Sequence, residues 1–458
     1  MTATLSSAAA GPGGAPLRAP PMAGSLAPAG GSLPLAAEHF AASMLYLLAG
    51  AVGLVWVAPE LARGSYLSPH VAAVTHLFTL GWLTTTIFGA LCQLLPVALG
   101  APVRSTRVAH AAFWVFAPGV AVFVAALETG AMALRVSGVL LVGSGILLAI
   151  GNFGATLLAA RARDVTWIAL ALALSFLGAT LVLGLVLLHN LHTGFIGAAR
   201  IVVLATHLHL ALVGWVLVTI VGVSHRLLPM FLLSHGAETR WTKRALVLLS
   251  VGVATLAVGL VAAGDALTWA AGVLLLGGLI AFLAQARAFH RARIRRRLDV
   301  GMQFAATALV FLAVAGLLGV AVLAAGAAHG RLATAYIAVG LLGGIVLYVV
   351  GFFYKIVPLL AWTGHYRGRM GKEAVPTVAQ TFSARLATVQ LWLMASAVAL
   401  IAVGIGGGDP VVVRIGASLF LAGVLVFAWQ IGGVALGRAA PAPAAPGPAA
   451  ANPPGGAE

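Results

Sequence analysis

The sequence predicts an all-α integral membrane protein with about twelve transmembrane helices in three pseudo-repeated four-helix units. Three observations predict it: the composition, a series of long apolar stretches, and an internal repeat. The 458 residues are 61% hydrophobic and 8% charged, and the mean hydropathy is +1.07. Because soluble globular proteins carry about 25% charged residues, this composition excludes soluble enzymes, nucleic-acid binders and disordered scaffolds. The single cysteine, Cys92, excludes intramolecular disulfides and iron–sulfur clusters.

The two ends of the chain differ in composition from its middle. Residues 1–36 are rich in Ala, Pro, Gly and Ser, and they lack the basic start and apolar run of a secretory signal. We expect a disordered tail there and a second one over 438–458, because neither segment holds enough apolar surface to fold. Residues 37–437 are expected to form the polytopic membrane domain.

Twelve apolar stretches fill this domain, each near or above the roughly 20 residues that cross a bilayer core. Each must be a helix, because lipid offers no water to satisfy backbone amides and carbonyls. The expected spans are 37–58, 69–97, 106–126, 131–160, 165–189, 200–233, 244–264, 267–289, 301–325, 331–362, 384–404 and 410–437.

Basic residues gather in alternate connections and predict the orientation. The connections after even-numbered spans hold Arg104, Arg107, Arg161, Arg163, Arg240, Lys243, Arg244, Arg287, Arg291, Arg293, Arg295, Arg296, Arg297, Arg367, Arg369 and Lys372. The other connections hold only Arg63, Arg135, Arg200, Arg331 and Arg414 in or beside them. The positive-inside rule places the richer connections and both termini in the cytoplasm, in a multi-pass protein of the cytoplasmic (inner) membrane. The net charge of +16 therefore needs no nucleic-acid partner; the first partner is the lipid bilayer.

An internal repeat relates the second, sixth and tenth spans. The segments HLFTLGWLTTTIFGALCQLLP (76–96) and HLALVGWVLVTIVGVSHRLLP (209–229) are identical at 10 of 21 positions. The segment 338–358 keeps Gly343, Gly351 and Pro358 in register but has Ala338 in place of the histidine. The offsets of 133 and 129 residues each correspond to about four helices, which predicts repeats over about 37–160, 165–289 and 301–437.

This pattern resembles the haem–copper oxidase subunit I superfamily, in which twelve helices form three four-helix arcs with histidines in helices 2 and 6. The repeated motif H-x4-GW-x3-TI-x-G-x4-LLP looks closer to short oxidase-like and NnrS-type membrane haem proteins than to the oxidases. The resemblance implies a haem b cofactor, iron ligated by histidine, and nitric oxide or oxygen chemistry or respiratory electron transfer. It also implies a cytochrome or other electron donor, and respiratory subunits, as partners.

The chain departs from the oxidase pattern at three places. The oxidases carry a His-x-His pair in helix 10, where this chain has Ala338 and no histidine beside it. The histidine pair for copper near helices 7 and 8 is missing from 244–289, and Val213 replaces the tyrosine four residues after His209. These departures argue against a complete copper-containing oxygen-reducing centre, so enzymatic turnover of the cytochrome c oxidase or nitric oxide type is left open.

The histidines of the repeat are the leading candidate ligands. His76 and His209 each lie 20 residues before a proline, which puts both about 30 Å from the inner ends of their helices. Polar side chains at membrane depth indicate function, and imidazole is the common axial ligand of haem iron. We expect His76 and His209 to be axial ligands, with His207 in reserve. An interhelical hydrogen bond is the alternative for each.

Further residues at the outer ends of the spans are secondary candidates. Haem propionates need cations, for which Arg200, Arg331 and Arg414 are available, although each also suits the interface as a snorkelling side chain. A copper site made of His189, His192 and His207 is a weaker hypothesis than solvated loop histidines. A polar path between helices is another hypothesis, with Thr84, Thr85, Thr86, Thr219, Tyr348 and Tyr354 as candidate residues.

Two alternatives to a membrane haem protein follow from the same residues. One is a metal or small-solute transporter whose outer histidines capture copper or zinc. The other is a membrane subunit that has kept the repeat and lost the cofactor. All acidic residues except Glu38 fall in expected loops or the C-terminal tail, which argues against a proton-driven transporter.

Overall fold

The computed structural model describes residues 33–262, 265–326 and 329–438, and most of these residues are helical. Twelve helical spans among them are long and apolar enough to cross a membrane. The described residues contain no β-strand, and an isolated bridge joins Ser234 to Arg293. The predicted fold class, an all-α multi-pass membrane protein, is therefore confirmed. The tails predicted at both ends lie, over 1–32 and 439–458, outside the described residues.

Of the twelve spans in the described residues, nine are single helices and three contain a π-helical segment. The single helices are α1 (Leu33–Trp56), α5 (Thr106–Thr129), α6 (Met132–Ala159), α7 (Val165–Thr193), α10 (Arg240–Ala262), α11 (Asp265–Arg291), α12 (Val300–Ala325), α15 (Ala384–Gly407) and α16 (Pro410–Ala435). The second span comprises α3 (Pro69–His76), η1 (Leu77–Thr84) and α4 (Thr85–Leu99). The sixth comprises α8 (Arg200–His209), η3 (Leu210–Leu217) and α9 (Val218–Leu232), and the tenth α13 (Gly330–Ala338), η4 (Val339–Val346) and α14 (Leu347–Tyr366). Short connecting helices are α2 (Ala58–Ala62), η2 (Gly197–Ala199), η5 (Arg367–Arg369) and η6 (Val378–Gln380).

The predicted boundaries agree with these helices to within a few residues. The largest difference at the N-terminus is α1, which begins at Leu33 and not at residue 37. Leu35 and Ala36 are buried, so the packed face of this helix extends into the Ala- and Pro-rich segment. Helix α1 thus includes the last four residues of the predicted tail, residues 33–36.

Several helices begin at an aspartate that caps them. Asp164 accepts a hydrogen bond from the Trp167 amide, and Asp299 and Asp409 cap α12 and α16 in the same way. An N-cap carboxylate satisfies amides that have no partner within the helix. The position of these carboxylates in connections thus has a structural cause.

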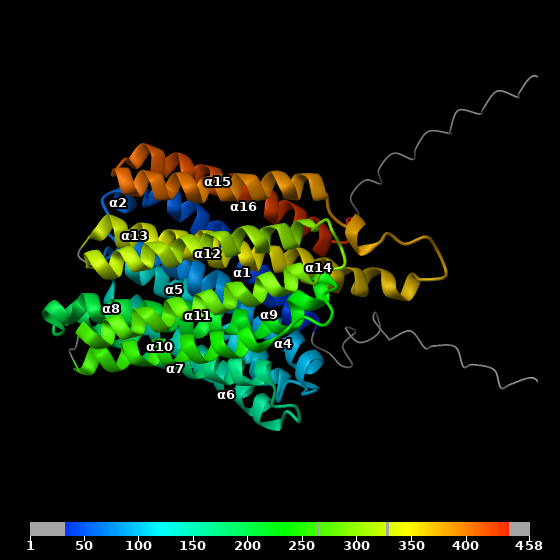
Figure 1. The fold of residues 1–458 in the computed structure, drawn as a ribbon, viewed down its shortest axis with the longest axis horizontal. Helices are drawn as coiled ribbons and strands as arrows, with labels where there is room; N and C mark the ends of the chain where they lie inside the picture. The colour runs from blue at the N-terminus through cyan, green and yellow to red at the C-terminus, as the bar shows by residue number, and fades with distance from the viewer. Residues whose placement is uncertain (1–32, 263–264, 327–328, 439–458) are drawn as a thin grey trace, which may run out of the picture.

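The spans lie roughly side by side along the long axis of the molecule, so the bundle has two ends (Figure 1). The helices α2, α8 and α13 lie at one end, and the far ends of α4, α9 and α14 lie at the other. We call the first the histidine end, because α3 and α8 finish there with His76 and His209. We call the second the proline end, after Pro96, Pro229 and Pro358.

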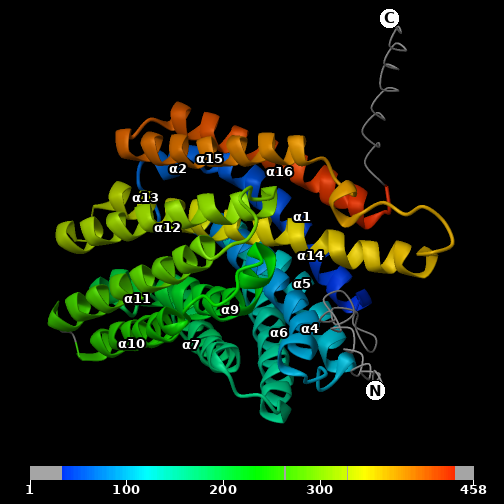
Figure 2. The ribbon, with the colours of Figure 1, turned by 45° about the vertical axis from the view of Figure 1, so that its right-hand side comes forward.

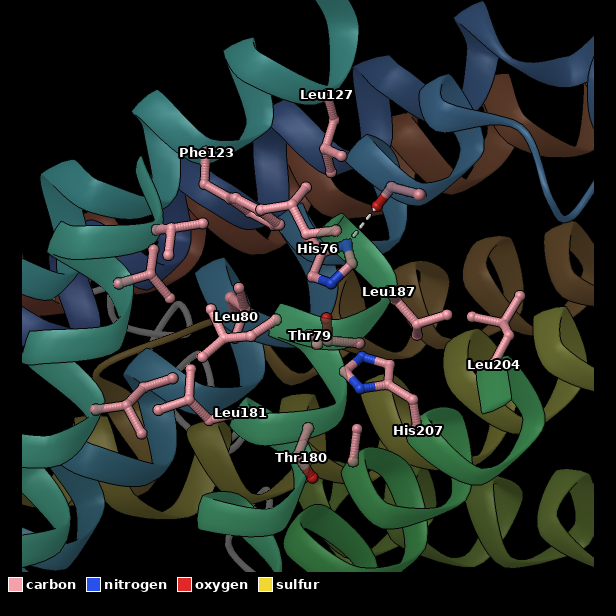
Figure 3. A pocket seen from close by; sticks show the side chains of 18 of the residues that line it. His76, Thr79, Leu80, Phe123, Leu127, Thr180, Leu181, Leu187, Leu204 and His207 are labelled. Carbon is pink, nitrogen blue, oxygen red and sulfur yellow. Dashed lines mark hydrogen bonds between the residues drawn. The ribbon is translucent and has the colours of Figure 1, made fainter. Parts of the chain in front are cut away.

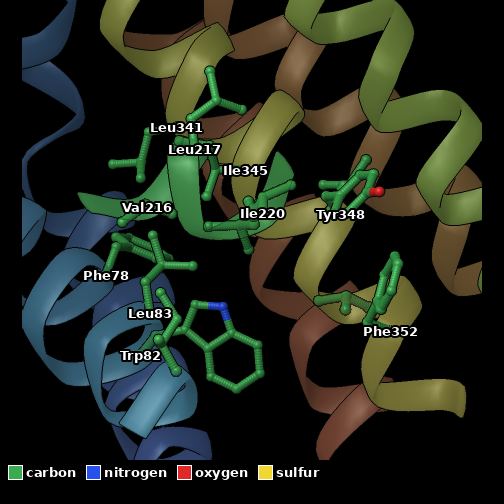
Figure 4. Close-up of a cluster of buried hydrophobic side chains, with 14 of the residues drawn as sticks. Phe78, Trp82, Leu83, Val216, Leu217, Ile220, Leu341, Ile345, Tyr348 and Phe352 are labelled. Atoms are coloured by element: carbon green, nitrogen blue, oxygen red, sulfur yellow. The ribbon is translucent and has the colours of Figure 1, made fainter. Parts of the chain in front are cut away.

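The second, sixth and tenth spans form the centre of the bundle. They are the three most buried of the twelve spans, and η3 contacts both η1 and η4. Three helical hairpins, α5–α6, α10–α11 and α15–α16, lie on three sides of this centre (Figure 2). Phe78 and Trp82 from the second span, Ile220 from the sixth and Ile345 and Tyr348 from the tenth meet in the shared core (Figure 4).

The three central spans share a π-helical segment of eight residues. The segments η1, η3 and η4 begin at residues 77, 210 and 339, which are separated by 133 and 129 residues. These are the same offsets that align the repeated sequences. Segments of π-helix are rare and occur often at functional sites. Their recurrence in register supports the three-unit repeat, which stays a prediction.

A glycine in each π-helical segment packs against an aromatic ring of the preceding span. A Cβ atom added to Gly81 would lie 2.5 Å from Tyr46 Cγ, and one on Gly214 would lie 2.8 Å from Phe176 Cγ. The third glycine, Gly343, faces Phe311 in the same way. The glycines that precede Trp82 and Trp215 therefore serve close helix packing.

Candidate functional site

His76 and His207 face each other at the histidine end of the bundle. His76 is the last residue of α3, and His207 lies in the last turn of α8. Their ring centroids are 6.5 Å apart and their planes are inclined by 35°. One nitrogen of each ring points toward the other ring (Figure 3). The structure therefore brings together one histidine from the second span and one from the sixth.

The orientation of His76 is fixed by its own helix. Its Nδ1 donates to the carbonyl of Ala72 at 2.7 Å, and its ring meets that of Phe123 edge-on at 5.2 Å. With the proton on Nδ1, Nε2 carries a lone pair. This nitrogen has no hydrogen-bond partner in the described part of the chain and is the one directed at His207 (Figure 3). Backbone-held histidines of this kind are typical metal ligands.

His207 is enclosed by the packing of its ring against α7. Its Nδ1 is buried and has no hydrogen-bond partner among the described residues. Gly184 of α7 makes room for the ring, because a Cβ atom there would lie 3.2 Å from His207 Cε1. Cε1 and Nδ1 thus face α7, and the other ring nitrogen, Nε2, is the one directed at His76 (Figure 3).

His209 takes part in a different contact. Its Nδ1 donates to the carbonyl of Ala205 at 2.8 Å, and the Tyr336 hydroxyl donates to its Nε2 at 3.2 Å. The two rings are stacked with centroids 6.2 Å apart. The histidines that the repeat aligns, His76 and His209, thus do not form the facing pair. Two residues along a helix correspond to a rotation of about 200°, so His207 and His209 face different neighbours.

Tyr336 is a contact residue that the sequence interpretation missed. It lies 129 residues after His207, which is the offset between the sixth and tenth spans. Extending the aligned segments by two residues toward the N-terminus would have placed it in register with His207. The tenth span therefore supplies a polar ring at this level although Ala338 replaces the aligned histidine.

Two cavities flank the facing histidines. A cavity of about 170 Å³ lies between the pair and the helices α5, α6 and α7. A second of about 120 Å³ lies on the other side, toward α1, α2, α13 and η4. His76, Thr79 and His207 line both. The rest of the lining is mainly aliphatic, so the pair stands between two apolar spaces.

Of the three arginines predicted as propionate partners, Arg200 lies at this site. It lines the larger cavity, and its Nη2 donates to the Leu67 carbonyl at 3.1 Å. Arg331 packs instead against the connection at Gly64 and against Gly408, and Arg414 is exposed on α16. Neither lines a histidine cavity. Of the three expected cations, Arg200 alone lines a histidine cavity, because Arg331 lies in α13 against Gly64 and Gly408, and Arg414 lies on the exposed face of α16.

The described residues do not bring His189, His192 and His207 together, as the weaker copper hypothesis would require. His189 and His192 are exposed at the end of α7, where His189 contacts the Phe195 ring at 5.3 Å. No group of three or more His, Cys, Asp or Glu side chains in the described ranges is placed to hold a metal ion. The chain leaves α7 through a left-handed turn at Gly194. His189 and His192 therefore lie outside the helical packing that encloses His207.

A hydrogen-bonded carboxylate and histidine, Glu60 of α2 and His70 of α3, flank the connection between these helices beside the cavities. Glu60 Oε1 is 3.0 Å from His70 Nδ1. Partial burial alone raises the pKa of Glu60, but hydrogen bonds from Ser68 and His70 and the charges of His70 and Arg63 outweigh it, so the pKa is lowered. This connection also carries Tyr66 and Leu67, which line the larger cavity.

No protein-family model matches the chain, and no curated protein matches it either. The chemistry of the site must therefore be inferred from its own geometry.

Proposed function

We propose that the chain is a membrane haem b protein in which His76 and His207 are the axial ligands. The facing arrangement of these two imidazoles is the observation that carries the proposal. Two metal–nitrogen bonds of about 2 Å, with the ring widths added, separate the centroids of two opposed imidazoles by about 6 Å. The separation of 6.5 Å in the structure agrees with this value.

The charges around the pair favour a porphyrin over a bare metal ion. Among the described residues that line the two cavities, Arg200 is the one Lys, Arg, Asp or Glu side chain. A bare cation held by two neutral imidazoles would place uncompensated charge in an apolar space, at a high desolvation cost. The porphyrin dianion neutralises ferrous iron, and a propionate would pair with Arg200.

The residues of the site would hold and insulate the cofactor. The Ala72 carbonyl keeps the proton of His76 on Nδ1, which leaves the other nitrogen basic and correctly oriented. Gly184 gives the His207 ring its space against α7, and the aliphatic walls exclude water. Haem in this position would supply one-electron transfer between ferric and ferrous iron.

Ligation of the iron by both His76 and His207 would favour electron transfer over gas chemistry. Binding of nitric oxide or oxygen at the iron needs an open coordination position, and a catalytic copper site needs additional histidines. The proposal is therefore a respiratory electron carrier. The resemblance of the histidine helices to those of oxidase-like and NnrS-type proteins supports a haem in this scaffold and is part of the proposal.

The test is cofactor analysis of the purified full-length protein from a haem-replete host. A pyridine haemochrome assay should give haem b, and the reduced protein should show the sharp α band of a six-coordinate haem. Elemental analysis should find iron in step with haem and no stoichiometric copper or zinc. Colourless protein, or stoichiometric copper or zinc without porphyrin, would refute the proposal.

A further inference from the structure

A larger cavity lies in the other half of the bundle, between α4, α9 and α14. It measures about 330 Å³ and is separate in its lining from both histidine cavities. Its walls are aliphatic and aromatic, with Tyr348, Phe352 and Phe353 on the α14 side. It reaches the proline end, where the lining residues Val97 and Met230 are exposed.

Unpartnered hydrogen-bond donors follow one face of the second span beside this cavity. Thr86 Oγ1 and Gln93 Nε2 both belong to lining residues, are buried, and have no hydrogen-bond partner within the described residues. Trp82, one turn away, does not line the cavity, but its Nε1 is also buried without a hydrogen-bond partner in the described part of the chain, and its indole lies across from Tyr348 and Phe352 (Figure 4). The spacings of four and seven residues keep all three on one helix face.

The π-helical segment explains why Thr86 differs from its neighbours. Thr84 and Thr85 donate to the carbonyls of Thr79 and Leu80, each five residues back. Thr86, the third threonine of the run, makes no such bond and turns to the cavity wall. The hydroxyl of Thr219, on the facing helix, is satisfied by the Trp215 carbonyl at 2.7 Å. Among the described lining residues, the hydrogen-bond donors without a partner, Thr86 and Gln93, thus both lie on the wall formed by α4.

The ligand that these donors fit is flat, apolar and carries acceptor oxygens on opposite edges. Buried water is a poor match, because it needs two to four polar partners and Thr86 and Gln93 stand about two helical turns apart. A phospholipid headgroup is a poor match too. Arg226, the one charged side chain among the described lining residues, already pairs with Asp164.

We propose that this cavity binds the ring of an isoprenoid quinone. One carbonyl oxygen accepts from Thr86 and the opposite one from Gln93, whose side chain leans back toward Thr86 as helical side chains do. The rings of Tyr348, Phe352 and Phe353 provide stacking surfaces, and the tail leaves through the apolar opening at Val97 and Met230. This proposal is independent of the haem proposal.

The test is quinone binding by the full-length protein in nanodiscs of synthetic, quinone-free phosphatidylcholine. The probe is a benzoquinone with a ten-carbon tail, titrated as a mole fraction of lipid and followed by quenching of tryptophan fluorescence. Thr86→Val and Gln93→Leu should each weaken binding about tenfold, the usual effect of one hydrogen bond. Thr219→Val is the matched control in the same cavity, and it should bind within about twofold of wild type because its hydroxyl is already satisfied.

The same variants separate loss of binding from loss of folding. Removing an unmet donor should leave the thermal midpoint without quinone unchanged or raised, so weaker binding by a stable variant supports the proposal. Binding by Thr86→Val and Gln93→Leu equal to that of Thr219→Val would overturn it. So would recovery of phospholipid alone when the protein is purified from native membranes and extracted. Because fluorescence reads binding without a haem signal, a colourless protein would leave this test intact.

Discussion

The two halves of the second span present opposite chemistry to the cavities beside them. Toward the histidine end, His76 offers a lone pair to an apolar space, and His207 of the sixth span offers another. Toward the proline end, Thr86 and Gln93 offer hydrogens to a second apolar space. Lone pairs attract an electrophile such as iron, whereas N–H and O–H groups attract acceptor oxygens. One helix can therefore serve two ligands, because the polar atoms on its two halves differ in kind.

The π-helical segment separates these halves and accounts for the difference. Before η1 the helix is regular, and the Ala72 carbonyl also accepts from His76 Nδ1, which orients the ring. After η1 begins, carbonyls five residues back satisfy Thr84 and Thr85 and leave Thr86 unmet. A change in backbone hydrogen bonding thus decides which side chains are pre-oriented and which remain available.

The largest effect is expected from removal of a facing histidine. His76→Ala and His207→Ala should each lower the haem content of purified protein at least tenfold and abolish the six-coordinate spectrum, because one axial bond is lost. His209→Ala is the matched control, since it removes a histidine two residues from His207 whose contact is Tyr336. Its spectrum should remain six-coordinate. If His209→Ala lost haem and His207→Ala kept it, the ligands would instead be His76 and His209, the pair that the repeat aligns.

The sequence predicts the helices of this protein better than it predicts which side chains meet. The lengths of the apolar stretches predict the helices closely, because a single apolar segment in a bilayer can satisfy its backbone groups internally as a helix. The position of His76 near the start of the second span is also read from the sequence, but its partner is not. Choosing His207 over His209 requires the rotation of α8 about its axis, which packing against α7 sets through Gly184. Sequence likewise marks the run Thr84, Thr85 and Thr86 as polar, but the π-helical hydrogen bonds decide which one faces a cavity.

A smaller effect is expected from filling the space at Gly81, which lies between the two halves. Its added Cβ atom would lie 2.5 Å from Tyr46 Cγ, and Tyr46 is held by the hydrogen bond from its hydroxyl to the Ala117 carbonyl. Gly81→Ala should therefore destabilise the protein by about 1–3 kcal/mol. Gly151→Ala in α6 is the control, because nothing lies within 4 Å of its added Cβ atom. The thermal midpoint in detergent should fall for Gly81→Ala alone; equal midpoints would show that the helices separate easily at η1.

The smallest expected effect is a loss of folding stability at low pH. It arises from carboxylates at the two ends of the bundle. Asp164, near the proline-end cavity, has a lowered pKa: burial raises it, but hydrogen bonds from Trp167 and Arg226 and the charge of Arg226 outweigh burial. The pKa of Glu60, near the histidine cavities, is also lowered: burial raises it, but the hydrogen bonds from Ser68 and His70 outweigh burial. A carboxylate with a depressed folded pKa contributes stability above its unfolded pKa of about 4 and loses it as the pH falls through the folded value.

Stability should therefore fall as the pH is lowered below about 4, and each carboxylate should account for part of the loss. Glu60→Gln should flatten this part of the profile by less than about 1 kcal/mol, because the group is partly exposed to solvent. Glu128→Gln is the control, since Glu128 lies 4.0 Å from His70 Nε2, beyond hydrogen-bond distance. Thermal midpoints between pH 3 and 7 measure the difference. If Glu60→Gln and Glu128→Gln give the same profile, the Glu60 contacts do not hold the connection beside the histidine cavities, and the two halves of the bundle do not differ in this respect.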